Sequence, residues 1–151
     1  NLKLSQARAE SVVTALPAYI PMRTDTGGNA GSQSASTFIR GIAVGEIHPR
    51  DLPRILWREF RVAVLCGAAL AVCNFGKLIF FDRVGVLVAA VVSLTLVITV
   101  IVSQLLGALL PIVADRVGID PAVMASPLIT TIVDTTTLLV YFNIARVLLP
   151  I

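Results

Sequence analysis

The sequence predicts an all-α protein: a polytopic helical membrane bundle with four transmembrane helices, one of which is interrupted. Hydrophobic residues make up 56% of the 151 residues and charged residues only 14%, which is less charge than a soluble domain keeps. The stretch 84–114 carries no charge at all, although about 20 apolar residues are enough to cross a bilayer. The 12 basic residues lie mostly at the ends of apolar runs. That distribution sets membrane topology and does not resemble a nucleic-acid-binding patch, so no nucleic-acid partner is expected.

The first predicted helix covers about residues 11–41 and contains a polar stretch, TDTGGNAGSQSAST, at 24–37. This stretch is too polar to face lipid and too poor in charge for an ordinary water-exposed helix. Because Pro21 and two adjacent glycines weaken a helix, we expect an interruption or kink between Pro21 and Gly28. Irregular backbone at membrane depth survives only inside protein or along a wet cavity. The residues expected to face a pore are Gly27, Gly28, Asn29 and Gln33. The alternative is a flexible, water-exposed linker.

Residues 40–61 form a basic loop and then an amphipathic segment. They contain five arginines and three acidic residues, and an excess of arginine places a loop in the cytoplasm. From Asp51 onward, apolar residues fall on one helical face, and Trp57 marks an interfacial depth. We therefore expect a short helix that lies on the membrane surface.

Two apolar segments, about 62–81 and 84–113, predict the next two membrane spans. A tight turn at Asp82 and Arg83 separates them. The second segment is longer than the minimum span and should therefore tilt or protrude. Alternation from the arginine-rich loop puts this turn outside the cell and the loop at 115–120 inside.

The last predicted span, about 121–149, holds an acidic residue, Asp134, near its middle. The nearest charges along the chain, Asp120 and Arg146, each lie roughly 20 Å away along a helix axis. A charge near the bilayer midplane costs at least ~2.5 kcal/mol and normally faces a cavity, a partner or an ion. We therefore expect Asp134 to bind a metal ion. The alternative is a buried carboxylate that accepts a hydrogen bond from a neighbouring helix.

Oxygen atoms are expected around Asp134 on its helical face. Residues three or four apart share a face, and a proline inside a helix frees the carbonyl four residues earlier. The oxygens expected to contact the ion or its water shell come from Val123, Ser126, Thr130 and Thr137. Several oxygens around one carboxylate suit a hard cation such as Mg²⁺.

Two separated groups of motifs occur together in this chain. The first group is TGGNAGSQSA at 26–35 and IRG at 39–41; the second is GALLP at 107–111, GIDPA at 118–122 and Pro127 with Asp134. Over about residues 12–150, the chain resembles the membrane domain of the MgtE family of magnesium transporters and channels. The resemblance implies five helices, of which this chain corresponds to helices two to five. It also implies a homodimer with the ion path at the subunit interface and a magnesium ion bound by Asp134 of both subunits. Family members carry cytoplasmic regulatory domains ahead of the membrane part, so such domains are expected partners.

The sequence therefore predicts transport of Mg²⁺ across the plasma (inner) membrane by one transmembrane ion-transport domain, residues 1–151. Mg²⁺ binds through one or two carboxylates and retains several waters, and a two-fold axis supplies two copies of Asp134. Transport of another hard divalent cation, Mn²⁺ or Co²⁺, is one alternative, and a non-transport membrane assembly protein is another. An intramembrane aspartyl protease with Asp25 and Asp134 is excluded because Asp25 precedes its glycines, so no enzyme is expected.

Overall fold

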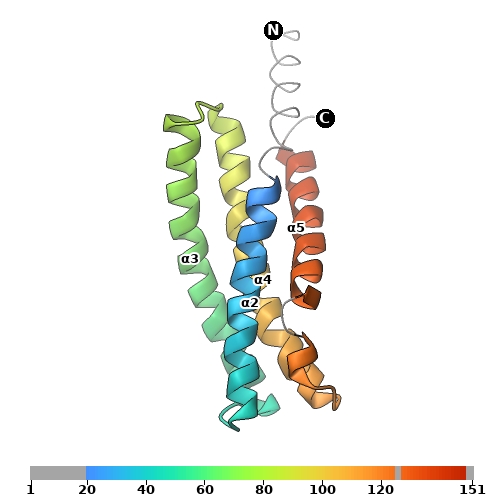
Figure 1. Cartoon of the computed structure of the whole chain (residues 1–151). Helices are drawn as coiled ribbons and strands as arrows, with labels where there is room; N and C mark the ends of the chain where they lie inside the picture. The colour runs from blue at the N-terminus through green and yellow to red at the C-terminus, as the bar shows by residue number, and fades with distance from the viewer. Residues whose placement is uncertain (1–19, 125–126, 149–151) are drawn as a thin grey trace.

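The computed structural model describes residues 20–124 and 127–148, and in this part of the chain every regular element is a helix (Figure 1). The long helices are α2 (Ile20–Ala43), α3 (Leu52–Phe80), α4 (Val86–Arg116) and α5 (Pro127–Leu148). Two short 3₁₀ helices, η2 (Pro49–Asp51) and η3 (Pro121–Met124), precede α3 and α5. The predicted all-α class is confirmed. By length and composition, α3 and α4 are apolar enough to cross a membrane.

Helix α4 lies at the centre of the bundle and packs against each of the other three long helices. Near its start, Val91 and Val92 are buried against Leu78 of α3 and Tyr141 of α5. Near its end, a second apolar cluster joins α2 and α3 to α4. That cluster consists of Phe38, Ile55, Ala108 and Ile112. Helices α2 and α5 also pack directly on each other, so these two helices lie side by side.

Helix α2 runs without a break from Ile20 to Ala43, so the predicted interruption between Pro21 and Gly28 is wrong. Pro21 lies at the start of the described part of α2, and the helix is continuous through Gly27 and Gly28. The glycines allow unusually close packing against α4. A Cβ atom on Gly31 would lie 3.1 Å from the carbonyl oxygen of Ser103, and one on Gly107 would collide with the carbonyl of Gly31. This backbone contact offsets the ~1 kcal/mol that a glycine costs a helix.

Helix α3 begins at Leu52 and not near residue 62, so it takes in the segment predicted to lie on the membrane surface. Ile55 is buried with Phe38 of α2, and Leu56 packs against the same cluster. The amphipathic segment therefore buries much of its apolar face in protein. Helix α4 agrees with the predicted 84–113 span to within three residues at each end.

The predicted 121–149 helix is divided into η3 and α5. Asp120 Oδ1 accepts a hydrogen bond of 2.9 Å from the Ala122 N–H, which fixes the start of η3. Pro127 is the first described residue of α5, since residues 125–126 lie outside the described part of the chain. Val123 belongs to the 3₁₀ helix η3, and a role for its carbonyl at the ion stays a prediction.

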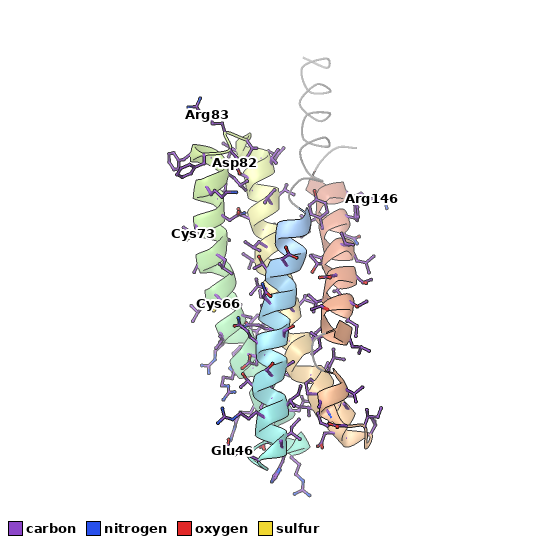
Figure 2. All side chains as sticks on the ribbon, viewed as in Figure 1. Glu46, Cys66, Cys73, Asp82, Arg83 and Arg146 are labelled. Carbon is purple, nitrogen blue, oxygen red and sulfur yellow. The ribbon has the colours of Figure 1, made fainter. Side chains whose placement is uncertain are left out.

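The two ends of the bundle differ in the residues that they carry. Figure 2 places Glu46, in the loop between α2 and α3, at one end and Asp82, Arg83 and Arg146 toward the other. The connection from α4 to α5 lies at the same end as Glu46 (Figure 1). This arrangement agrees with the predicted alternation of the loops.

Candidate cation site

Asp134 lies on α5 where this helix contacts α2, and the residue is half-buried. The main chain of α2 opposite the carboxylate belongs to Gly28. A Cβ atom on Gly28 would lie 3.9 Å from Asp134 Oδ1 and 3.4 Å from Thr130 Cγ2. The absence of a side chain at this glycine therefore leaves space beside one carboxylate oxygen.

The residues of α2 predicted to line a pore divide into two groups. Asn29 and Gln33 are exposed, whereas Gly27 and Gly28 are buried. Gly28 faces α5 and Asp134. Gly27 faces α4 as well, because a Cβ atom there would lie 2.7 Å from Thr99 Cγ2 and 3.2 Å from a methyl group of Val133. The structure thus brings Gly28 to the predicted metal ligand and gives Gly27 a packing role.

The exposed face of α2 is polar along the helix. Its exposed residues recur every three or four positions, which is the spacing of one helical face. We call this face the polar stripe of α2, and it consists of Asp25, Asn29, Gln33 and Ser36. The Ser36 hydroxyl donates to its own helix, to the carbonyl of Ser32 at 2.8 Å. The amide side chains of Asn29 and Gln33 are exposed on the same face.

The predicted oxygens of α5 and the preceding turn do not all converge on Asp134. Thr130 is half-buried beside Gly28, and Thr137 is buried, at 4% exposure, within the bundle. Val123 lies in η3 with 63% of its surface exposed. Ser126 lies outside the described residues. Of the residues predicted on this face, the structure therefore places Thr130 next to the site, with its Cγ2 methyl group toward Gly28.

The sequence does not single out a second poorly exposed carboxylate, that of Glu59 on α3. Its side chain is only 13% exposed, and its Oε1 atom lies 3.6 Å from the Nε atom of Arg58. The hydroxyl of Ser34 on α2 lies 3.3 Å from Glu59 Oε2 and 3.1 Å from the carbonyl oxygen of Gln104 on α4. Glu59 is the sole acidic residue of α3, but it lies between Arg58 and Arg61, so the sequence does not distinguish it from a residue on a water-exposed face.

Asp25 is the other acidic residue near the site. It belongs to the polar stripe, three residues before Gly28, and its carboxylate repels that of Asp134. Two carboxylates near one open space attract a divalent cation. Within the described ranges, no group of three His, Cys, Asp or Glu side chains is close enough to hold a metal ion. Mg²⁺ needs only one or two carboxylates, since it keeps several of its waters.

Comparison with known proteins identifies the family of this chain. The family model of MgtE, described as a divalent cation transporter, matches residues 20–144. The magnesium transporter MgtE of Thermus thermophilus is 41% identical over 137 residues, which cover 91% of this chain and 30% of the relative. Those of Bacillus subtilis and Enterococcus faecalis are 35% and 32% identical, over 88% and 89% of this chain and 29% and 30% of the relatives. The chain thus spans about three-tenths of the length of these relatives. The family predicted from the paired motifs is confirmed, and the chain belongs to the MgtE family of divalent cation transporters.

Proposed function

We propose that this chain forms the membrane-spanning part of a Mg²⁺ transporter, in which two copies enclose the ion path and Asp134 of each copy binds the ion. The identity of the ion comes from the relatives, which are named magnesium transporters. Family membership and the two apolar helices α3 and α4 indicate an integral membrane protein. We assign it to the plasma (inner) membrane, with residues 40–61 at the cytoplasmic side because of their five arginines.

The observation that carries the proposal is the polar stripe of α2 beside Asp134. Amide and hydroxyl side chains on a membrane span are costly against lipid, so they face a partner or water. In a single chain this stripe is exposed. A second copy, related by a two-fold axis, covers the stripe and brings a second Asp134 to the same path.

The lengths of α2 and α5 suit this arrangement. Their 24 and 22 residues correspond to about 36 Å and 33 Å, against a hydrocarbon thickness of about 30 Å. Together with α3 and α4, they give four crossings. Helix α2 is the least apolar of the four long helices, as expected of a helix that faces a wet path.

The chemistry of the site favours a hydrated divalent ion. Two carboxylates neutralise one Mg²⁺, and the ion then fills its remaining positions with water. In this proposal the waters lie next to Asp134 Oδ1, on the side where Gly28 carries no side chain. The hydroxyl group of Thr130 and the amide groups of Asn29 and Gln33 bind the water shell. Ligands that contain only oxygen also suit Mn²⁺, and no His or Cys lies within this set.

The test is cation flux into proteoliposomes that contain a magnesium-sensitive dye. The Asp134→Asn variant keeps the side-chain volume and removes the charge, so we expect flux to fall at least about tenfold. The matched control is Asp82→Asn, which removes a carboxylate bonded to Lys77 in the turn at the far end of α3. Undiminished flux in Asp134→Asn would contradict the proposed site. Flux of Mn²⁺ and Co²⁺ in the same vesicles measures selectivity.

A further inference from the structure

A second candidate site lies at the end of the bundle that carries Glu46. There, the last turns of α2, the following loop, η2 and the first turns of α3 surround a surface cavity of about 650 Å³. Its charged lining consists of Arg40, Glu46, Asp51, Arg54 and Arg58. No residue of the Asp134 site belongs to this lining. The cavity therefore needs an explanation of its own.

The arginines of this cavity are largely without acidic partners. Three guanidinium groups and two carboxylates line it, which leaves one excess positive charge. Arg58 lies 3.6 Å from Glu59, but within the described part of the chain neither Arg40 nor Arg54 forms an ion pair. Each free guanidinium offers five N–H donors in a planar fork. Such a fork matches the paired oxygens of a phosphate group.

The cavity lies at the depth where lipid headgroups are expected. It is lined by the start of α3, and α3 is long and apolar enough to cross a membrane. On another face of the same turns, Trp57 and Phe60 are exposed and stack with ring centroids 5.8 Å apart. Exposed tryptophan marks the boundary between lipid tails and headgroups. Arg54 and Arg58 are four residues apart on one face, so both reach the cavity at this level.

We propose that this cavity binds the headgroup of an anionic phospholipid from the cytoplasmic leaflet. Arg40 and Arg54 donate to the phosphate oxygens, and Arg58 adds positive charge beside them. Basic pockets between membrane helices on the cytoplasmic side recognise such headgroups. The oxygens of one phosphodiester can accept from both Arg40 and Arg54, which form no ion pair in the described part of the chain. Glu46 and Asp51 are placed to accept hydrogen bonds from headgroup hydroxyls and disfavour more highly charged anions.

The proposal distinguishes three ligands that share part of this chemistry. Phosphatidylglycerol carries one negative charge and hydroxyl groups, phosphatidylcholine carries no net charge and no hydroxyl donor, and inorganic phosphate carries no acyl chains. The two lipids are compared with the same acyl chains, in native mass spectrometry of the purified protein. We expect the protein to retain phosphatidylglycerol and to lose phosphatidylcholine. We also expect millimolar inorganic phosphate to leave the bound phosphatidylglycerol in place.

The decisive variant is Arg40→Gln with Arg54→Gln. Removal of each arginine should weaken phosphatidylglycerol binding about fivefold. The matched control is Arg50→Gln with Arg116→Gln, which removes two charges at the same end from a neighbouring cavity. We expect this control to bind like the unaltered chain. A second variant, Glu46→Gln with Asp51→Asn, raises the positive charge of the lining and should bind phosphatidylglycerol more tightly even if the arginine variant folds poorly.

Three results would overturn the proposal. The first is equal binding of phosphatidylglycerol by the Arg40/Arg54 variant, shown by circular dichroism to be folded, and by the unaltered chain. The second is equal retention of phosphatidylcholine. The third is displacement of the lipid by millimolar phosphate, which would assign the cavity to a free anion. Since lipid binding is measured without ion flux, its outcome is independent of the transport proposed for Asp134.

Discussion

Ser34 is the residue at which three helices meet. Its hydroxyl, on α2, lies within hydrogen-bond distance of Glu59 on α3 and of a main-chain carbonyl of α4. It is 7% exposed, so both acceptors are largely shielded from water. A hydrogen bond to a charged group in such surroundings is stronger than one between neutral groups. Ser34 therefore positions the helix that carries the polar stripe.

We expect Ser34→Ala to lower the free energy of unfolding by about 1–3 kcal/mol, because the Glu59 carboxylate loses its donor. Glu59→Gln should also be destabilising. The double variant should be less destabilised than the sum of the two, with a coupling of about 0.5–3 kcal/mol. Thermal unfolding in detergent provides the measurement. Ser36→Ala is the control, since Ser36 is exposed and donates within its own helix. Strict additivity would show that the Ser34–Glu59 contact contributes nothing.

At the level of single residues, an isolated charge can be singled out from the sequence, whereas a charge among others cannot. Asp134 stands out because its span contains no other charge within several turns. Glu59 lies between Arg58 and Arg61 and therefore reads as part of a water-exposed face. Its burial depends on Ser34, which lies 25 residues earlier, and on the packing of α3 against α4. Such contacts between helices cannot be read from the spacing of residues within one helix.

At the level of helices, the glycines of α2 and α4 have different structural tasks. A Cβ atom on Gly27 or Gly107 would meet atoms of a neighbouring helix at 3.0 Å or less. One on Gly28 would make ordinary contacts, and one on Gly76 of α3 would meet no heavy atom within 4 Å. Substitution of these glycines by alanine therefore separates packing from function.

We expect Gly27→Ala to lower the free energy of unfolding by about 1–3 kcal/mol through overpacking. Gly107→Ala should lower it further, because the added methyl group meets the main chain of Gly31, which cannot move aside as a side chain can. Gly76→Ala is the control and should leave thermal stability unchanged or raise it. Equal melting temperatures for all three variants would contradict the close helix contact.

Gly28→Ala should behave differently from the other glycine variants. Its methyl group has room, so stability should be maintained, but it lies 3.9 Å from Asp134 Oδ1. It would occupy space that the water shell of the ion needs, so we expect Mg²⁺ flux to fall several-fold. Flux and melting temperature of the same preparation check both parts. A melting temperature that falls together with flux would indicate a packing role alone.

The helices themselves were predicted more reliably than their ends. Long apolar runs predicted the positions of α3 and α4, because a helix that is buried in lipid or in protein needs a long run of apolar residues. The predicted break in α2 failed because glycine weakens an isolated helix but strengthens a close helix contact. The division before α5 was missed because Pro127 can either interrupt a helix or begin one, and local sequence does not choose between these outcomes.

At the level of the whole molecule, the polar stripe predicts where a second copy attaches. In a background that lacks the exposed residues Cys66 and Cys73, a cysteine at Asn29 or Gln33 should form cross-linked dimers with a short thiol reagent. Mg²⁺ should change the yield, because the ion binds the assembled site in preference to separate chains. The control is Val72→Cys on α3, where the side chain is 74% exposed and should remain uncross-linked. Cross-links that form only at Val72 would show that the dimer interface lies on the exposed face of α3 and not on the polar stripe of α2.

The contact between Gly31 and Gly107 also limits how the bundle can move. If α2 slid along α4 by one helical turn, about 5.4 Å, Ser103 or Pro111 would replace Gly107 against the Gly31 carbonyl. Neither side chain fits where a single Cβ atom already collides, so this pair of helices has one register. Shear between α2 and α4 is therefore blocked, and the two helices must tilt or rotate as one rigid body. In the proposed dimer, a change in the width of the ion path then requires that this pair move against α5 or against the other copy.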